Sequence, residues 1–230
     1  MHQQHRGSPL AYAVLGILVL PAMLFSTVAC TDQKEQAAAP QQTQQMDHSE
    51  HAGMDHSQHM AMLSNKGQYH VSTAKYSLPD VKLVDMVNKE FSLPAIFDND
   101  KPTMVNFIFT TCTTICPIMT ATFAQAQDML GPELEKVQMV SISIDPEQDT
   151  PEKLLEYAFK YQAAPVWNFY TGKKDDVITA LKAFDAYRGD KMNHEPITLL
   201  RKNKESDWVR LEGLTSAADL IAEYNKVIAQ

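Results

Sequence analysis

Residues 107–117 read Phe-Ile-Phe-Thr-Thr-Cys-Thr-Thr-Ile-Cys-Pro. The apolar, β-rich run at the start of this segment predicts the end of a buried strand, which we place at 103–110. Pro117 suits the first position of a helix, because its missing N–H costs nothing there. The segment therefore predicts a strand, a turn that carries Cys112, and a helix that starts with Cys116 at or beside its N-cap.

The two cysteines are four residues apart, a spacing that allows their sulfurs to act together. Unpaired N–H groups and partial positive charge at a helix N-terminus favour thiolate over thiol, so we expect Cys116 to be a good nucleophile and metal ligand. Residues four apart on a helix have Cβ atoms about 5–6 Å apart, whereas a disulfide needs about 3.8 Å. The pair can close if the turn around Cys112 bends, and it suits two sulfurs that bind one ion. From spacing alone, a structural disulfide and two inert buried thiols remain alternatives.

Composition limits the classes of function that the chain can have. Its 230 residues are enough for one domain with a full core and additional segments. The formal net charge of −8 argues against nucleic acid as a partner. The three cysteines are an odd number, and of the eight histidines only His194 follows His70.

Residues 1–30 read as a targeting segment with an apolar run from Leu10 to Ala29. The Thr-Val-Ala sequence before Cys30 resembles a bacterial lipoprotein signal, in which Cys30 is lipidated after cleavage. An uncleaved membrane anchor is the alternative, because the run is just long enough to span a bilayer. Both predict a chain tethered in the bacterial cell envelope with its domain in the periplasm. Lipidation would leave Cys112 and Cys116 as the only pair.

Residues 31–66 are rich in Gln, Ala, His and Met without apolar periodicity, which predicts a disordered linker. An eight-residue repeat, at 46–53 and 54–61, keeps Met, Asp, His, Ser and His in register. Imidazole and thioether groups are copper ligands, and a solvated spacer is the alternative. The candidates for an auxiliary metal site are Met46, His48, His51, Met54, His56 and His59.

Residues 67–230 have the pattern of a globular domain. Strands alternate with helices, and a hairpin and a final helix close the domain. We therefore expect an α/β fold, a thioredoxin-like three-layer sandwich with a central mixed sheet. The predicted strands are 82–86, 90–92, 103–110, 136–144, 166–170, 197–202 and 207–211. The predicted helices are 117–130, 151–161, 174–187 and 217–227, the last capped by Ser216 or a neighbour.

Sites in open α/β sheets form at the carboxyl ends of the strands. Cys112 and Cys116 follow one such end, Asp145 follows its probable neighbour, and His194 lies in a loop that can reach the same edge. Two thiolates and one imidazole suit three-coordinate copper(I), and a fourth ligand suits copper(II). We expect Asp145 to support the ligands without binding the metal. An ordinary loop histidine and a turn aspartate before Pro146 are the alternatives.

The chain resembles the Sco/SenC family of copper-binding, thioredoxin-like proteins. Three pieces carry this resemblance: the Phe109–Pro117 segment, the sequence Val-Ser-Ile-Ser-Ile-Asp-Pro-Glu-Gln-Asp-Thr-Pro-Glu at 140–152, and His194. Together they cover about residues 75–230. The resemblance implies that the two cysteines and the histidine bind copper, and that the protein helps to assemble the dinuclear CuA centre of cytochrome c oxidase.

Three hypotheses follow. The first is a copper chaperone that delivers Cu⁺ or Cu²⁺, or reducing cysteines, to the oxidase subunit that carries CuA. The alternative is a membrane-tethered periplasmic thiol–disulfide oxidoreductase with Cys112 and Cys116 as its redox pair. The third is a peroxide-handling or redox-sensing protein. Because the pair tends to close in an oxidising compartment, copper loading requires a periplasmic thioredoxin-like reductant as a partner.

Overall fold

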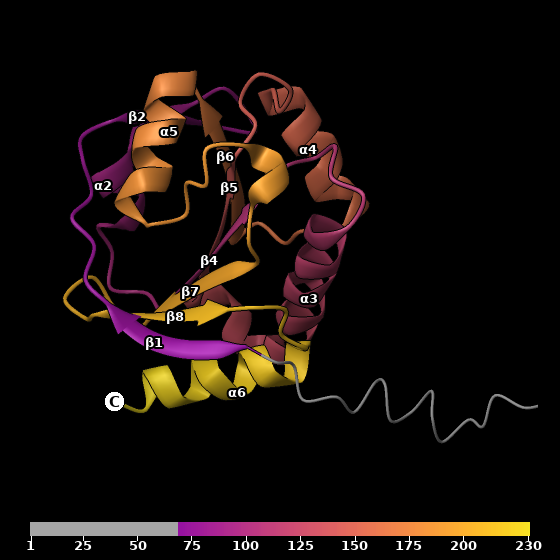
Figure 1. Cartoon of the computed structure of the whole chain (residues 1–230). Helices are drawn as coiled ribbons and strands as arrows, with labels where there is room; N and C mark the ends of the chain where they lie inside the picture. Colours follow the sequence, from indigo (N-terminus) through magenta and orange to yellow (C-terminus); the bar gives the residue numbers. More distant parts are fainter. Residues whose placement is uncertain (1–68) are drawn as a thin grey trace, which may run out of the picture. The chain divides into compact units, whose positions relative to one another are not determined.

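A computed structural model describes residues 69–230 (Figure 1). The predicted targeting segment with Cys30, and the linker with its Met/His repeat at 46–61, lie outside these residues. Within residues 69–230, no helix is both long and apolar enough to cross a membrane.

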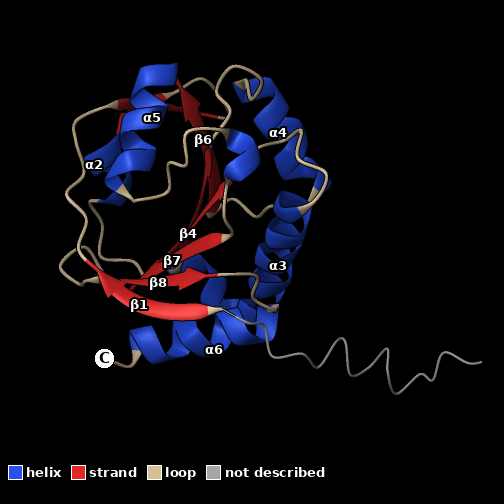
Figure 2. Ribbon diagram, viewed as in Figure 1, coloured by secondary structure: helices blue, strands red, loops and turns tan. Residues whose placement is uncertain are grey.

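The described residues form one mixed sheet of eight strands (Figure 2). The order across the sheet is β1-β8-β7-β4-β5-β6-β2-β3. The three central strands β4, β5 and β6 are parallel, and the other neighbours are antiparallel. The strands are β1 (His70–Ala74), β2 (Lys82–Asp85), β3 (Glu90–Ser92), β4 (Thr103–Ile108), β5 (Gln138–Ser143), β6 (Trp167–Gly172), β7 (Ile197–Arg201) and β8 (Trp208–Glu212).

Helices cover both faces of the sheet, which makes three layers. One core cluster packs side chains of α3, α4 and α6 against the sheet, and a second packs those of α2 and α5 against the opposite face. The α-helices are α2 (Leu93–Phe97), α3 (Ile115–Leu130), α4 (Pro151–Lys160), α5 (Lys174–Ala183) and α6 (Ala217–Ile228), and the 3-10 helices are η1 (Gly131–Lys136) and η2 (Lys191–Asn193). The predicted α/β sandwich with a central mixed sheet is confirmed.

Strand β4 lies in the middle of the core because both of its faces are apolar. Every residue of Thr103–Ile108 is buried. Met104 and Ile108 belong to one core cluster and Val105 and Phe107 to the other, as the two-residue period of a strand requires. The short turn that carries Cys112 follows directly, so a rigid central strand positions the cysteines.

Several predicted boundaries were wrong. Strand β1 and helix α2 were not expected, and β4 ends two residues before the predicted 110, because the Cys112 N–H turns back to the Phe109 carbonyl (3.2 Å). Strand β5 spans 138–143 rather than 136–144. Helix α5 ends at Ala183 rather than 187, since Asp185 adopts a left-handed conformation (φ 49°) that a helix cannot continue through.

Other boundaries agree with the sequence. The hairpin of β7 and β8 is present. Thr150 caps α4 by accepting the Lys153 N–H, and Ser216 caps α6 by accepting the Asp219 N–H. Helix α3 ends before Gly131, whose φ of 50° is costly for any residue with a side chain.

Candidate metal centre

The two cysteines lie on either side of the start of α3. Cys112 is in the turn after β4, and Cys116 is the second residue of the helix, which begins at Ile115 after Thr114. Cys116 was predicted at or beside the N-cap, and it lies two residues after the cap residue Thr114. Pro117 is the third helical residue, and it is still in the first turn, where the backbone N–H groups have no partner within the helix.

The two thiols differ in burial and acidity. Cys116 is fully buried, whereas Cys112 is partly exposed. Burial raises the pKa of Cys116 far above its usual value, and the nearby sulfur of Cys112 raises it further. Burial also opposes ionisation of Cys112, but hydrogen bonds from the Cys116 and Thr114 backbones outweigh it, and the net pKa of Cys112 is lowered. The thiol with the lowered pKa is therefore Cys112, and not Cys116, for which the sequence predicted it.

The helix start provides donors to the Cys112 sulfur, and the residue after β4 provides one to the Cys116 sulfur. The Cys116 N–H points at the Cys112 sulfur (3.5 Å), and the Phe109 N–H points at the Cys116 sulfur (3.4 Å). Thr114 Oγ1 lies 3.7 Å from the Cys112 sulfur. Donors of this kind stabilise a negative sulfur, whether it is free or bound to a metal.

His194 reaches the same place from a different part of the chain. It directly follows η2, and its Nε2 lies 3.3 Å from the Cys116 sulfur. Its Nδ1 lies 2.9 Å from the Lys191 carbonyl. A carbonyl only accepts hydrogen bonds, so Nδ1 holds the proton and Nε2 presents a lone pair. The ring packs edge-on against Phe109 (5.1 Å between centroids), and burial lowers the pKa of the imidazole.

The three predicted ligands therefore converge. One donor atom from each of Cys112, Cys116 and His194 lies within 4.8 Å of the other two. In a three-coordinate site with bond lengths of about 2.0–2.3 Å, the donor atoms stand about 3.7–4.0 Å apart. The donor atoms of this group are thus close to the spacing that such a site requires. Two soft sulfurs and one imidazole are a donor set that suits copper(I).

Asp145 lies behind the histidine rather than beside the sulfurs. Its buried carboxylate pairs with the Lys191 ammonium (2.5 Å). This pair holds the pKa of Lys191 above its usual value. The carbonyl of the same lysine accepts the Nδ1 proton of His194. Asp145 can thus act on the histidine only through Lys191.

Asp149 was not singled out from the sequence, although it lies in the 140–152 block. It is fully buried and accepts hydrogen bonds from the Thr110 N–H (3.1 Å), the Thr110 hydroxyl (2.6 Å) and the Ser143 hydroxyl (2.6 Å). Burial raises the pKa of this carboxyl. The contacts fasten the turn before Cys112 to the end of β5. The sequence signal was the pair of aspartates at 145 and 149, of which we used only the first.

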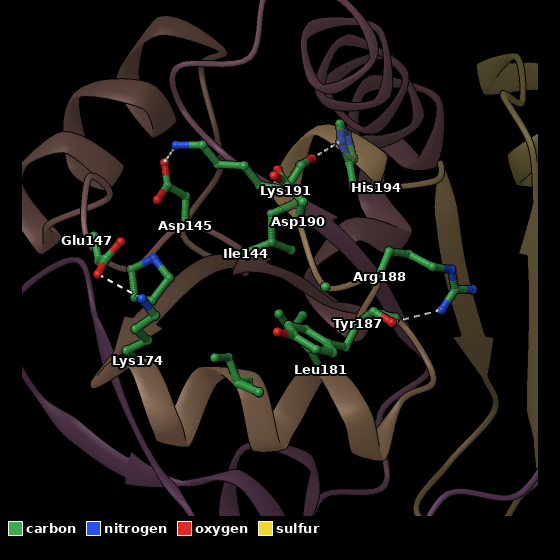
Figure 3. Close-up of a pocket in the computed structure, with 14 residues that line it drawn as sticks. Ile144, Asp145, Glu147, Lys174, Leu181, Tyr187, Arg188, Asp190, Lys191 and His194 are labelled. Carbon is green, nitrogen blue, oxygen red and sulfur yellow. Dashed lines mark hydrogen bonds and ion pairs between the residues drawn. The ribbon is translucent and has the colours of Figure 1, made fainter.

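Two cavities flank the histidine. One of about 200 Å³ is bordered by Cys112, Met192 and His194. The other, of about 260 Å³, lies on the side of Asp145 and is shown in Figure 3. In that view the Asp145–Lys191 pair and the exposed Glu147–Lys174 pair (2.9 Å) both border the second cavity. The first cavity reaches Cys112 and His194 but not the buried Cys116, and the second is lined by paired charges.

Comparison with known proteins supports the family resemblance. A family model described as SCO1/SenC matches residues 94–229. A protein of Bacillus subtilis described as an SCO1 protein homolog is 42% identical over 86 residues, which are 36% of this chain and 45% of that protein. The match thus spans less than half the length of that relative.

Solved structures share the fold. A structure of BsSco, described as a member of the Sco family of cytochrome c oxidase assembly proteins with a disulfide switch, is 28% identical, with a TM-score of 0.57, and the match covers 69% of this chain and 96% of that chain. Bradyrhizobium japonicum ScoI, solved with copper bound, is 20% identical with a TM-score of 0.54, covering 65% and 98% of the two chains. At 20% identity, that likeness concerns the fold.

Proposed function

Because the chain belongs to the SCO1/SenC family, we propose that it is a copper chaperone for assembly of the CuA centre of cytochrome c oxidase. Copper is its cargo, held by Cys112, Cys116 and His194. The observation that carries this proposal is the approach of these three donor atoms to within 4.8 Å of one another. The partner is the oxidase subunit that carries CuA.

The donor set suits a metal that is bound and then released. Copper(I) displaces the proton that the buried Cys116 thiol retains at neutral pH, and this proton passes to solvent. Cys112 is the more acidic thiol and is open to solvent, so it offers a thiolate where copper enters. His194 needs no change of protonation, because burial favours its neutral form and its Nδ1 is already bonded to a carbonyl.

A thiol–disulfide oxidoreductase is the second candidate. The contrast between an accessible acidic Cys112 and a buried Cys116 favours it. The Cys112 thiolate would attack a partner disulfide, and Cys116 would then displace the partner's second thiol. The chain would gain a disulfide, and the partner would gain two electrons and two protons. The same pair could reduce the cysteines of the oxidase subunit before copper arrives.

Substitution of His194 separates the two functions. We expect His194→Ala to lower the copper(I) affinity about 100-fold, or about 2.7 kcal/mol, because one of three ligands is lost. Exchange with a model disulfide should stay within about threefold of wild type, since neither sulfur is changed. His70→Ala, at an exposed histidine of β1, is the matched control. Equal loss of both activities in His194→Ala would contradict a separate metal role.

The redox state of the cysteines should control copper loading. A closed disulfide has no thiolate for the metal, so the oxidised protein should bind copper(I) at this centre at least about 100-fold more weakly than the reduced protein. A periplasmic thioredoxin-like reductant would then be required before loading. Equal affinity of the two forms, measured by chelator competition, would remove the need for that partner.

Anchoring and the linker rest on sequence alone. We propose that Cys30 is lipidated in the bacterial envelope, that residues 31–66 are a linker, and that 67–230 form the periplasmic domain. An uncleaved anchor is the alternative, and a Cys30→Ser chain that stays in the membrane fraction would favour it. If the repeat at 46–61 binds copper through its histidines, that copper should dissociate as the pH falls through about 6.5.

A further inference from the structure

Met192 stands at the solvent side of the three donor atoms. It lies in the middle of η2, two residues before His194, and its backbone N–H bonds to the Asp190 carboxylate (2.8 Å). Its side chain is 73% exposed. The same side chain borders the cavity of about 200 Å³ that Cys112 and His194 also border. A flexible thioether is thus held at the entrance through which the donors meet solvent.

Packing in the core does not explain why an apolar methionine stands at position 192. Its large apolar side chain is mostly in solvent, and it belongs to neither core cluster. By contrast, Cys116 is completely buried and Cys112 is partly exposed, so the centre is open to solvent on the side of Cys112. Met192 lines that side. Three rotatable bonds let its sulfur sample much of the cavity.

The chemistry of a thioether suits transfer better than storage. It is a soft donor that prefers copper(I). It carries no proton near neutral pH, so it can bind or release copper without the proton transfer that a thiol requires. It is also neutral, and it does not add charge to a site with two thiolates.

We propose that Met192 is a transfer ligand, whose sulfur binds copper(I) while the ion passes between this centre and a donor or acceptor. This inference rests on the proposed copper-chaperone function. On entry, a bond from copper to the Met192 sulfur forms as a bond to the donor's ligand breaks. The bond to the Met192 sulfur then breaks as copper binds Cys112, Cys116 and His194, and the Cys116 proton passes to solvent. Copper stays in the +1 state throughout, and Met192 neither gains nor loses a proton.

The test measures the rate of copper(I) transfer from a bicinchoninate complex to the reduced chain by stopped-flow absorbance. Full-length chains are used in which the repeat ligands His48, His51, His56, His59, Met46 and Met54 are replaced by Ser, so that these six side chains do not compete with the domain for copper. We expect Met192→Leu to slow transfer at least about fivefold while the equilibrium affinity stays within about threefold. Met192→His, which restores a copper ligand, should recover at least half of the lost rate.

Met129→Leu is the matched control, because Met129 is also exposed (53%) and lies on α3 away from the cavity. Its transfer rate should equal that of the parent chain. If Met192→Leu transfers copper as fast as Met129→Leu, Met192 is not a transfer ligand, although the chaperone function stands. If the parent chain itself does not bind copper(I), the proposed function fails, and this inference fails with it.

Discussion

Two segments meet at one rim of the sheet but are held there by different contacts. The cysteine segment is residues 109–118, which carry both cysteines, and the histidine segment is residues 185–196, which carry His194. The cysteine segment joins the central strand β4 to the long helix α3. The buried Asp149 carboxylate accepts short hydrogen bonds from the Thr110 hydroxyl of this segment and from the Ser143 hydroxyl at the end of β5. The Cys116 side chain packs in the core. This half of the centre is part of the folded core.

Contacts at the surface hold much of the histidine segment, although Ala186 at its start packs in the core cluster of α2 and α5 and the buried Arg210 donates to the Asp185 carbonyl (3.0 Å). Arg188 pairs with Glu195 (2.8 Å), and both side chains are partly open to solvent. Lys191 pairs with Asp145, whose side chain is nearly buried. Gly189 adopts a left-handed conformation (φ 80°), and the 3-10 turn η2 provides a single short element. Because exposed ion pairs contribute little, we expect this segment to be the adjustable half of the centre.

We expect the largest effect on stability from removing the side chain that bonds the cysteine segment to β5. Asp149→Ala leaves two hydroxyls and one N–H without their acceptor, and we expect it to lower the free energy of unfolding by about 3 kcal/mol. Urea unfolding measures this. Asp128→Ala, at an exposed aspartate of α3, should change stability by less than about 0.5 kcal/mol. If Asp149→Ala also lowered the free energy of unfolding by less than about 0.5 kcal/mol, the buried hydrogen bonds of Asp149 would not stabilise the cysteine segment.

The second effect is a difference in reactivity between the two cysteines of the cysteine segment. We expect iodoacetamide to modify Cys112 about 100-fold faster than Cys116 at pH 7, because the thiolate reacts and only Cys112 is both accessible and lowered in pKa. Its rate should rise with pH to a plateau and have its midpoint below the pKa of an ordinary cysteine. The raised pKa of Cys116 places its midpoint above that value. Mass spectrometry of the two peptides separates the rates, and equal rates would refute the assignment.

The third effect probes the partly buried ion pair of the histidine segment. Asp145→Asn removes the charge that holds Lys191, and the Lys191 carbonyl holds His194. We expect copper(I) affinity to fall about tenfold, or about 1.4 kcal/mol. Glu147→Gln is the matched control, since it breaks the neighbouring exposed pair with Lys174 and should leave affinity unchanged. An equal effect of the two variants would show that Asp145 has no special role.

The smallest effect concerns the surface pair of the histidine segment. Arg188→Gln breaks the bond to Glu195, and we expect the free energy of unfolding to change by less than about 0.5 kcal/mol. Differential scanning calorimetry at low and high salt measures this change. A large destabilisation would mean that the histidine segment is fixed as firmly as the cysteine segment, and the contrast between the two would disappear.

The two segments also differed in how far they could be predicted. The order of strands and helices around 103–130 followed from apolar periodicity and from Pro117, although the helix start was misplaced by two residues. Around 185–196 there is no periodic pattern, and η2 and the end of α5 were missed. That both segments reach the same rim was an expectation from sheet topology, and the geometry confirmed it.

The sequence by itself determined the α/β class, the family resemblance and the identity of the three candidate ligands, because periodicity and short motifs are local properties of the chain. Only the tertiary structure decided which cysteine is buried, that Asp149 rather than Asp145 fastens the cysteine segment, and that Met192 borders the entrance. The physical reason is that burial, and the acidity that depends on it, are set by neighbours distant in the chain. Cys116 and His194 are 78 residues apart, yet their donor atoms are separated by 3.3 Å.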